Sequence, residues 1–360
     1  MTRPLRVLFI TRKYPPRIGG MEQLSYHLTQ KIPCEKTIIA WRHSQIWLPF
    51  FTIAVMLYAL FSARRYDMIH IGDPVLSIIA WVMKRVYPRK KIATTVHGLE
   101  LTYPNPLYQR YIRWCIRSFD LYICISSSTE RLAKKWGLEP RVVIPVGVDI
   151  EDWSRTYERR ELSDFLGMPT SERFVCITTG RLVQRKGVLW FVKTVMPKLP
   201  ESVIYLVLGK GPMAPSIQRE IHKRNLGDRV KLLGGVSRER LRMIYRTADL
   251  FVMPNILVPG DAEGFGIVAI EAGASGLPVL ASNIEGIRDA VKEGKSGWLV
   301  EAGDAGAFRQ RIADFAANPS SLVVIRTEAE IFVREHYNWS IIVERYLDAF
   351  NRLIPSTTSH

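Results

Sequence analysis

One stretch decides the fold of this 360-residue chain: Ala262-Glu263-Gly264-Phe265-Gly266-Ile267-Val268-Ala269-Ile270-Glu271-Ala272. Its glycines predict a turn, and the residues from Ile267 onward predict a helix that ends before Pro278. Gly264 and Gly266 carry no Cβ, so a ligand can approach the backbone of this turn closely. The helix start presents N–H groups that lack partners within the helix, and such groups attract phosphate. The stretch therefore predicts a phosphate-binding corner.

Two carboxylates frame this corner. Glu263 lies in the turn, and Glu271 follows eight residues later, about two turns along the helix. Because like charges repel, carboxylates beside a phosphate are better suited to neutral hydroxyl groups than to the phosphate itself. The hydroxyl groups of a sugar and of a ribose meet that requirement. An ordinary helix with a surface glutamate at each end would show the same spacing.

The arrangement resembles the Glu-x7-Glu motif of retaining glycosyltransferases with the GT-B fold, in particular glycosyltransferase family 4. The resemblance implies that Glu263, with the backbone of Phe265, Gly266 and Ile267, holds the sugar of a nucleotide-sugar donor. It also implies that Glu271 holds the ribose of the nucleotide. The similarity extends over nearly the whole chain, although the N-terminal half matches in layout more than in residues.

A second motif, Gly180-Arg181-Leu182-Val183-Gln184-Arg185-Lys186-Gly187, follows a predicted strand over residues 174–178. The growing charge of a departing nucleoside diphosphate must be neutralised by a metal ion or by fixed cations. Arginine offers a forked contact and lysine a point charge. The sequence has no Asp-x-Asp cluster to hold a metal, so we expect cations to act and no metal site. The match to the diphosphate loop of the family implies this role for Arg181 and for Lys186, whose side chain is expected to be exposed.

The N-terminal half begins with a predicted strand over residues 6–11, a glycine loop and a helix from Met21, the layout of a phosphate-facing corner. It lacks a G-x-G-x-x-G fingerprint, so a dinucleotide site is not indicated. The resemblance implies that Gly19 and Gly20 lie near the donor diphosphate, while a plain turn is the alternative. His97 follows the predicted strand 91–96, at the sheet edge where ligands bind. The resemblance implies that His97 contacts the donor sugar, although isolated histidines are often structural.

The basic charge is concentrated in the N-terminal half of the chain. The net charge is +16, and residues 1–150 hold 22 Lys/Arg against 9 Asp/Glu, a net +13. Residues Ser44–Ala63 contain no charged side chain and are just long enough to span a bilayer. We do not expect them to span, because residues 66–71 read as the next strand of the same sheet. A helix lying in a membrane interface and a fully buried crossover helix both remain open.

A helix predicted over residues 108–117 places Arg110, Arg113 and Arg117 on one face beside aromatic residues, a pattern typical of a helix that meets an anionic surface. A solvated basic face is the alternative. The four cysteines form no C-x-x-C pair, and the N-terminus shows no signal-peptide pattern. We therefore expect a cytoplasmic protein that is peripheral on the inner membrane face, with an anionic membrane surface as a partner and no nucleic acid.

The resemblance implies a GT-B architecture, with two doubly wound Rossmann-like domains facing a central cleft. We place an acceptor-binding domain at residues 1–163, a donor-binding domain at 164–338 and a returning C-terminal helix at 339–354. Residues 155–164 read as a charged linker that contains the hinge.

The implied activity is the transfer of a sugar, with retention of configuration and without a metal or other cofactor. The donor would be UDP- or GDP-linked, and the acceptor a saccharide or lipid-linked saccharide such as a lipopolysaccharide core. The implied catalytic residues are Glu263, His97, Arg181 and Lys186.

Three other functions share parts of this pattern. A nucleotide-sugar epimerase of the same fold would have the same donor site but would need no acceptor. A nucleic-acid-binding protein would explain the charge, but the sequence contains no recognition-helix or RNA-binding motif. A membrane scaffold with a decayed site would not need all the donor-site residues to be present.

Overall fold

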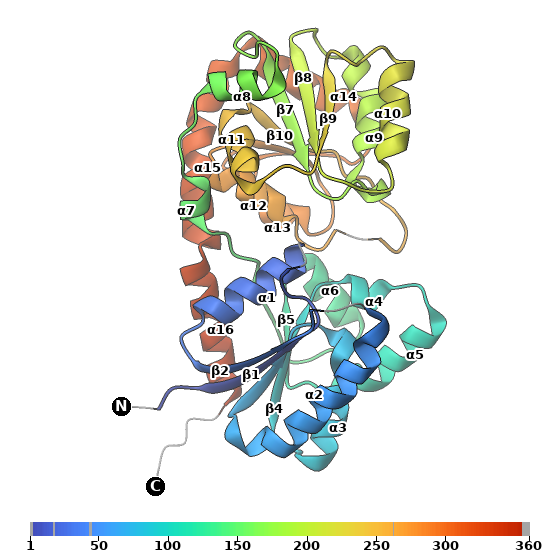
Figure 1. The fold of residues 1–360 in the computed structure, drawn as a ribbon, viewed down its shortest axis with the longest axis vertical. Coiled ribbons are helices and arrows are strands. Elements are labelled where there is room, and N and C mark those ends of the chain that lie inside the picture. The colour runs from blue at the N-terminus through green and yellow to red at the C-terminus, as the bar shows by residue number, and fades with distance from the viewer. Residues whose placement is uncertain (1–2, 17–18, 43–44, 262, 355–360) are drawn as a thin grey trace. The chain divides into compact units, whose positions relative to one another are not determined.

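The computed structural model describes residues 3–16, 19–42, 45–261 and 263–354, arranged as two compact units (Figure 1). The first unit comprises Met1–Gly147 and Trp339–His360, and the second comprises Val148–Asn338. The second unit thus begins before the boundary expected after residue 163. Parts of three stretches named above lie outside the described residues, namely Ala262 of the turn, Ser44 of the uncharged segment and residues 17–18 of the N-terminal loop.

The first unit is built on a six-stranded sheet with the strand order β2-β1-β3-β4-β5-β6, in which all neighbouring strands are parallel. Its strands are β1 (Arg6–Thr11), β2 (Glu35–Ala40), β3 (Met68–Ile71), β4 (Lys91–Val96), β5 (Leu121–Cys124) and β6 (Arg141–Val143). Short apolar runs form these strands because both faces of a parallel sheet are covered by helices. The order reverses between β1 and β3, which makes their carboxyl ends a switch point where ligands bind in such sheets.

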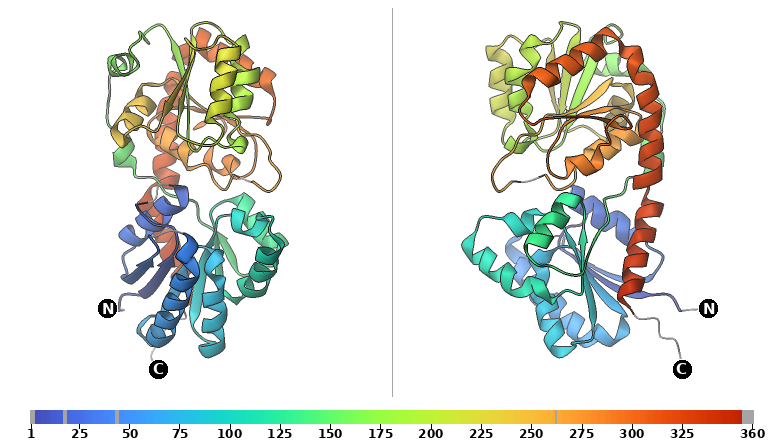
Figure 2. Two further views of the ribbon diagram at one scale, coloured as in Figure 1. Left: turned by 45° about the vertical axis from the view of Figure 1, so that its right-hand side comes forward. Right: turned by 180° about the vertical axis from the view of Figure 1, so that it is seen from behind.

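Helices cover both faces of this sheet (Figure 2). On one face, Phe9 of β1 lies 6.4 Å from Phe350, measured between ring centroids, and α1 packs against α16. On the other face, Leu8 and Ile10 share a core with α2, α3 and α5. The helices of the unit are α1 (Gly20–Lys31), α2 (Leu48–Ser62), α3 (Ser77–Val86), α4 (Leu99–Thr102), α5 (Pro106–Cys115), α6 (Ser127–Lys135) and α16 (Trp339–Leu353).

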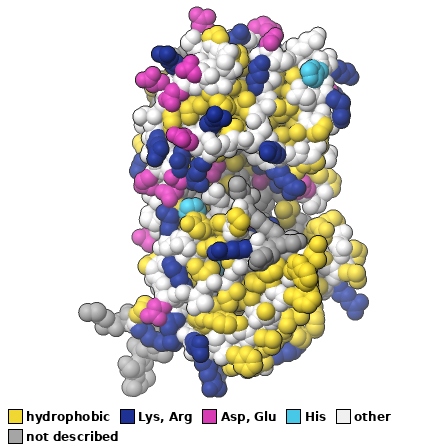
Figure 3. Space-filling model, viewed as in Figure 1, with side chains coloured by type: hydrophobic (Ala, Val, Ile, Leu, Met, Phe, Trp, Pro, Cys, Tyr) yellow, Lys and Arg dark blue, Asp and Glu magenta, His cyan; other side chains and the backbone are white. Residues whose placement is uncertain are grey.

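The uncharged segment forms α2, and only one side of this helix is buried. Phe51, Val55 and Ala59 pack into the core under the sheet, whereas Phe50 is 66% exposed and Phe61 is 88% exposed. The alternative of a fully buried crossover helix is therefore wrong. Hydrophobic side chains gather on the surface where α2 runs (Figure 3). Among the described residues, the stretch Leu48–Arg65 is long and apolar enough to cross a membrane by length and composition, with a mean hydropathy of 1.2.

The second unit is built on another parallel six-stranded sheet, with the order β12-β11-β10-β7-β8-β9. The order reverses between β7 and β10, so this sheet is also doubly wound and has its own switch point. Its strands are β7 (Phe174–Thr179), β8 (Val203–Leu208), β9 (Val230–Gly234), β10 (Leu250–Met253), β11 (Val279–Ser282) and β12 (Gly297–Val300). The predicted α/β class with two doubly wound sheets is confirmed.

The helices of the second unit alternate with its strands along the chain (Figure 1). On one face of the sheet, Phe191 of α9 packs 4.8 Å from Tyr205 of β8, measured between ring centroids. The helices are α7 (Ile150–Trp153), α8 (Arg159–Leu166), α9 (Val188–Thr194), α10 (Ala214–Lys223), α11 (Arg238–Thr247), α12 (Ile267–Ala274), α13 (Ile287–Ala290), α14 (Ala305–Ala317) and α15 (Val323–Tyr337).

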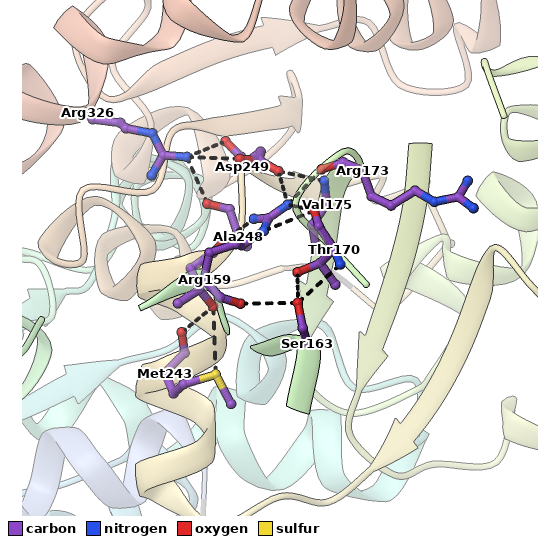
Figure 4. A network of polar contacts seen from close by, with 10 residues as sticks. Arg159, Ser163, Thr170, Arg173, Val175, Met243, Ala248, Asp249 and Arg326 are labelled. Atoms are coloured by element: carbon purple, nitrogen blue, oxygen red, sulfur yellow. Dashed lines mark hydrogen bonds and ion pairs between the residues drawn. The ribbon is translucent and has the colours of Figure 1, made fainter. Parts of the chain in front are cut away.

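The stretch interpreted as a charged linker is instead partly helical and is fixed to the second unit. Arg159, the first residue of α8, donates to Asp249 Oδ2 at 2.9 Å and to the carbonyl oxygen of Arg173 at 2.7 Å (Figure 4). The same Asp249 oxygen accepts the N–H of Val175 at 2.7 Å, so one carboxylate joins α8 to the start of β7. The interpretation failed because the partners of Arg159 are distant in sequence. A charge-rich sequence alone resembles a solvated linker.

Candidate active site

The candidate site of the second unit is formed by three loops at one edge of its sheet. The loops follow β7, β10 and β11, which are neighbours in the sheet, and they carry Lys186, Glu263 and Glu285. Glu263 Oε2 lies 2.7 Å from Lys186 Nζ, 3.1 Å from Asn255 Nδ2 and 3.5 Å from Arg185 Nε. The structure therefore joins the two motifs that the sequence presented separately.

The loop that carries Lys186 is shaped by glycines at both of its ends. Gly187 has a φ of 66°, and a Cβ at this position would collide with the carbonyl oxygen of Pro254. The N–H of Ile256 donates to the carbonyl oxygen of Arg185 at 2.9 Å. A Cβ built on Gly180 would lie 3.7 Å from Cε of Lys186, so the lysine stem passes close to this glycine. Only glycine allows the loop to approach the segment after β10 this closely.

Lys186 is not exposed as the sequence analysis expected. Its side chain is only 11% exposed, because the stem packs near Gly180 and the ammonium pairs with Glu263. The expectation rested on lysine usually being solvated, and local sequence does not reveal the distant carboxylate. Arg181 does have an exposed side chain, and no ion pair joins it to Glu263 within the described part of the chain.

The charges around Glu263 favour its ionised form. Burial alone would raise the pKa of Glu263, but the charges of Lys186 and Arg185 and the hydrogen bond from Asn255 outweigh burial, and the pKa is lowered. Arg185 also pairs with Asp261 at 2.7 Å. Arg185 and Lys186 are thus already partnered by carboxylates, and an incoming anion must share these cations or displace a carboxylate.

Glu285 holds the backbone of Glu263. The carboxylate of Glu285 accepts a short hydrogen bond from the N–H of Glu263, and the N–H of Gly286 donates to the Glu263 carbonyl oxygen at 3.3 Å. Glu285 has a φ of 47°, a left-handed conformation that is rare for residues other than glycine. Its pKa is raised by burial and by the nearby charge of Glu263, whose N–H acts in the opposite direction.

Helix α12 begins beside this cluster at Gly266, whose φ is 81°. Phe265 is 3% exposed, and its ring packs 5.8 Å from that of Tyr337, so its side chain is not available to a ligand. Ile267 is the first residue of the helix. Glu271, also on α12, is partly buried, and burial raises its pKa to about 7 although the charge of Arg238 acts in the opposite direction.

The first unit carries the remaining predicted residues in the segments that follow β1 and β4. His97 is buried, its Nε2 donates to the carbonyl oxygen of Gly72 at 3.0 Å, and its N–H donates to Glu100 Oε1 at 2.5 Å. Arg12, at the end of β1, pairs with the buried Asp73 at 2.9 Å. A buried polar cluster therefore surrounds His97.

Two further features belong to the same edge of the first sheet. Burial and the charge of His97 lower the pKa of the neighbouring His70 to about 3. Gly19 and Gly20 form the start of α1, with Gly19 as its N-terminal cap, and the Glu22 carboxylate lies beside Gly19. Glu22 in turn pairs with Lys13 at 3.3 Å.

Sequence reasoning missed several residues that shape these sites. Asn255, Asp261 and Glu285 contact the Lys186–Glu263 cluster, and Asp73 and Glu100 line the His97 cluster. Asn255 and Asp261 could have been considered because they lie in the same loop as Glu263. Nothing in the local sequence distinguishes Glu285 or Glu100 from glutamates that lie on a protein surface. Within the described residues, no group of three or more His, Cys, Asp or Glu side chains is placed to hold a metal ion.

Two family models match the chain, one over each half. The model described as Glycosyltransferase Family 4 matches residues 3–152, and the model described as Glycosyl transferases group 1 matches residues 158–331. The chain belongs to the family 4 glycosyltransferases. The predicted family is thereby confirmed.

Two relatives of this glycosyltransferase have names that state a lipid-linked acceptor. It is 25% identical to the GDP-mannose-dependent alpha-(1-6)-phosphatidylinositol monomannoside mannosyltransferase of Mycobacterium tuberculosis, covering 95% of this chain and 97% of that protein. It is 27% identical to the UDP-Gal:alpha-D-GlcNAc-diphosphoundecaprenol alpha-1,3-galactosyltransferase of Escherichia coli, covering 71% of this chain and 67% of that protein.

Solved structures share the GT-B fold of this glycosyltransferase. Anabaena HepE in complex with UDP-glucose superposes with a TM-score of 0.80 at 18% identity, covering 97% of this chain and all of that one. The sucrose-phosphate synthase of Thermosynechococcus elongatus superposes with a TM-score of 0.77 at 20% identity, covering 98% of this chain and all of that one. At 18% and 20% sequence identity, this structural similarity establishes a shared fold.

Proposed function

We propose that this glycosyltransferase moves a sugar from a UDP- or GDP-linked donor to a saccharide or lipid-linked acceptor, with retention of configuration and without a metal ion. The observation that carries the proposal is the Glu263 carboxylate held by Lys186 and Asn255 beside the start of α12. This arrangement combines a cation for a diphosphate, a carboxylate for hydroxyl groups and a helix N-terminus for phosphate.

The departing diphosphate would be neutralised by side chains of the loop after β7. The ammonium of Lys186 would leave the Glu263 carboxylate and bind a phosphate oxygen. The side chain of Arg181, which is exposed to solvent, would move to contact the diphosphate. Fixed cations of this kind stabilise the charge that develops on a leaving group. The first-turn N–H groups of α12 and the backbone at Gly19 and Gly20 would add to this stabilisation.

The sugar and the ribose would be bound by the two glutamates. Once Lys186 turns to the diphosphate, the ionised Glu263 can accept hydrogen bonds from sugar hydroxyls, with Asn255 holding its orientation. Glu271 would accept from the ribose. Because Glu263 is held by a lysine and an amide, we assign it to binding rather than to covalent attack. His97 would contribute from the first unit, with its Nε2 fixed by the carbonyl oxygen of Gly72.

The donor class can be tested by thermal unfolding with UDP, GDP and ADP and with their sugars, each in the presence of EDTA. We expect one nucleotide to raise the melting temperature under these conditions. Turnover that stops when EDTA is added would contradict the metal-independent proposal. Proton NMR of the product then reports the anomeric configuration, and inversion would contradict retention. Conversion of the donor sugar without any acceptor would identify an epimerase instead.

The proposals for the acceptor class and for the cellular location rest on observations outside the donor site. Named relatives use phosphatidylinositol-linked and undecaprenol-linked acceptors, and the first unit combines a net charge of +13 over residues 1–150 with exposed apolar side chains on α2. These features support a lipid-linked acceptor and a cytoplasmic enzyme that is peripheral on the inner membrane face. Assay of the same donor with lipid-linked and with free saccharide acceptors separates the two acceptor classes.

A further inference from the structure

Helix α2 presents a continuous apolar face to solvent. The exposed residues recur every three or four positions, which places them along one side of the helix. We call this set, together with Trp47 directly before the helix, the outer face: Trp47, Phe50, Ile53, Leu57 and Phe61. The opposite side packs on the sheet through Phe51, Val55 and Ala59. A helix that needed burial on one side alone would carry polar residues on the other. The outer face is therefore not explained by folding.

The apolar surface continues across the neighbouring helices. Helix α3 contacts both α2 and α5, and its Trp81 lies 4.4 Å from Trp114 of α5, measured between ring centroids. Trp114 is 59% exposed, and Leu107, two turns earlier on α5, is 81% exposed. Three helices of the first unit thus contribute to one surface.

The helices that form this surface carry arginines and have no carboxylate in their own sequences. The sequence over residues 40–66, 74–91 and 106–118, which includes α2, α3 and α5, contains no Asp or Glu. Arg85 lies with its guanidinium carbon 3.4 Å from the ring centroid of Trp81. The exposed arginines of these stretches are Arg42, Arg64, Arg65, Arg85, Arg89, Arg110, Arg113 and Arg117. Apolar side chains bordered by cations match the interface of an anionic bilayer, where arginines reach the headgroups.

We infer that the outer face of α2, together with Leu107 and Trp114 of α5, inserts into the interface of an anionic lipid bilayer. The inference deepens the proposed function, because it rests on the proposed peripheral location and names the surface that makes the contact. Charge favours a bilayer over a second copy of the chain. Two copies meeting through this surface would bring their arginines together, whereas anionic headgroups attract them. The helix lies in the interface and does not cross it, because its inner side is packed on the sheet.

The test uses the full chain and sedimentation with vesicles of phosphatidylcholine alone and of phosphatidylcholine mixed with phosphatidylglycerol. The wild type should bind the anionic vesicles, and added salt should weaken binding because it screens the headgroup charge. The double variant Phe50→Ser/Phe61→Ser should lower vesicle affinity by roughly tenfold or more for each buried ring that is lost. Its matched control is Val323→Ser/Val324→Ser, an exposed apolar pair on α15 of the second unit.

A second pair of variants tests how much the arginine charges contribute to vesicle binding, independently of the apolar side chains. Arg110→Gln/Arg117→Gln should reduce binding to anionic vesicles and flatten its dependence on salt, while Arg311→Gln, an exposed arginine on α14, should change neither. Thermal shift with nucleotide should be unchanged in every one of these variants. That readout distinguishes a failure of the surface from a failure of the donor site.

Three outcomes would overturn the inference. The first is no sedimentation of the wild type with any vesicle. The second is equal vesicle binding by the wild type and Phe50→Ser/Phe61→Ser. The third is a wild-type dimer, detected by light scattering, that becomes monomeric in Phe50→Ser/Phe61→Ser and is accompanied by no vesicle binding. The surface would then bind a second copy of the chain.

Discussion

The carboxylate of Glu285 accepts the backbone N–H of Glu263, and Glu285 adopts a left-handed backbone conformation to do so. Such a conformation costs a residue with a Cβ on the order of 1–2 kcal/mol relative to glycine. A residue that is strained yet hydrogen-bonded to a proposed sugar-binding residue indicates a role in positioning that residue.

We therefore predict that Glu285→Gly impairs donor use while leaving stability nearly unchanged. Relief of strain offsets the lost hydrogen bond, so the free energy of unfolding should change by no more than about 1 kcal/mol. The KM for the donor should rise severalfold, because Glu263 is no longer held. Glu285→Gln retains an acceptor and should keep a near-wild-type KM. Urea unfolding and steady-state kinetics measure the two effects, and an unchanged KM in Glu285→Gly would rule out the positioning role.

Replacement of Lys186 by Met should lower affinity for the nucleotide roughly ten- to hundredfold, the range for loss of a hydrogen bond to a charged group. Methionine keeps an apolar stem near Gly180 and removes only the ammonium. The pKa of Glu263 should rise in this variant, because Lys186 is the largest influence that lowers it. Calorimetric titration with the nucleotide measures the affinity. Lys223→Met, on the exposed end of α10, is the control, and an equal loss there would discredit the assignment.

Affinity for the nucleotide should increase as the pH rises from about 6 to about 8. Burial raises the pKa of Glu271 to about 7, and only its ionised form accepts hydrogen bonds from ribose hydroxyls through both oxygens. Arg238 and Tyr245 are the charged or titratable groups that interact with Glu271. Glu271→Gln should bind more weakly than the wild type at the higher pH and should lack this pH dependence. A wild-type affinity that is constant across the range would contradict the ribose role.

The same shift has a consequence for stability. The folded pKa of Glu271 lies above its ordinary value of 4.5, so between these two values the folded state retains a proton that the unfolded state releases. The contribution of Glu271 to stability is therefore present below about pH 4.5 and is lost as the pH rises toward 7. Urea unfolding of the wild type and of Glu271→Gln should diverge over this interval, with the wild type losing stability relative to the variant.

Gly187→Ala should destabilise the protein more than Gly167→Ala does. Both glycines are left-handed, with φ values of 66° and 63°, so each substitution carries a conformational cost of roughly 1–2 kcal/mol. A Cβ on Gly167 meets open space, whereas one on Gly187 collides with the carbonyl oxygen of Pro254, which adds about 1–3 kcal/mol. Urea unfolding measures the free energy of unfolding of the two variants. Equal losses would show that the close approach of the two loops is unimportant.

Much of the fold could be predicted because its determinants are local. Short apolar runs such as Arg6–Thr11 predict buried parallel strands, and the glycine turn before Ile267 predicts the start of α12. The charged stretch at residues 155–164 was misinterpreted, because Arg159 and Asp249 are 90 positions apart and meet only in the folded chain. The sequence also could not predict which side of α2 is exposed. A helix that is apolar all round has no periodicity to indicate which side is buried.

By itself, the sequence determined the class of fold, the family and the two motifs that carry Lys186 and Glu263. Each of these depends on residue types at fixed spacings within a short window. The tertiary structure alone decided that Lys186 pairs with Glu263, that Glu285 holds the Glu263 backbone and that Trp47, Phe50 and Phe61 face solvent. These relationships arise because adjacent parallel strands bring distant loops to one sheet edge, and because packing on the sheet selects which side of a uniformly apolar helix is covered.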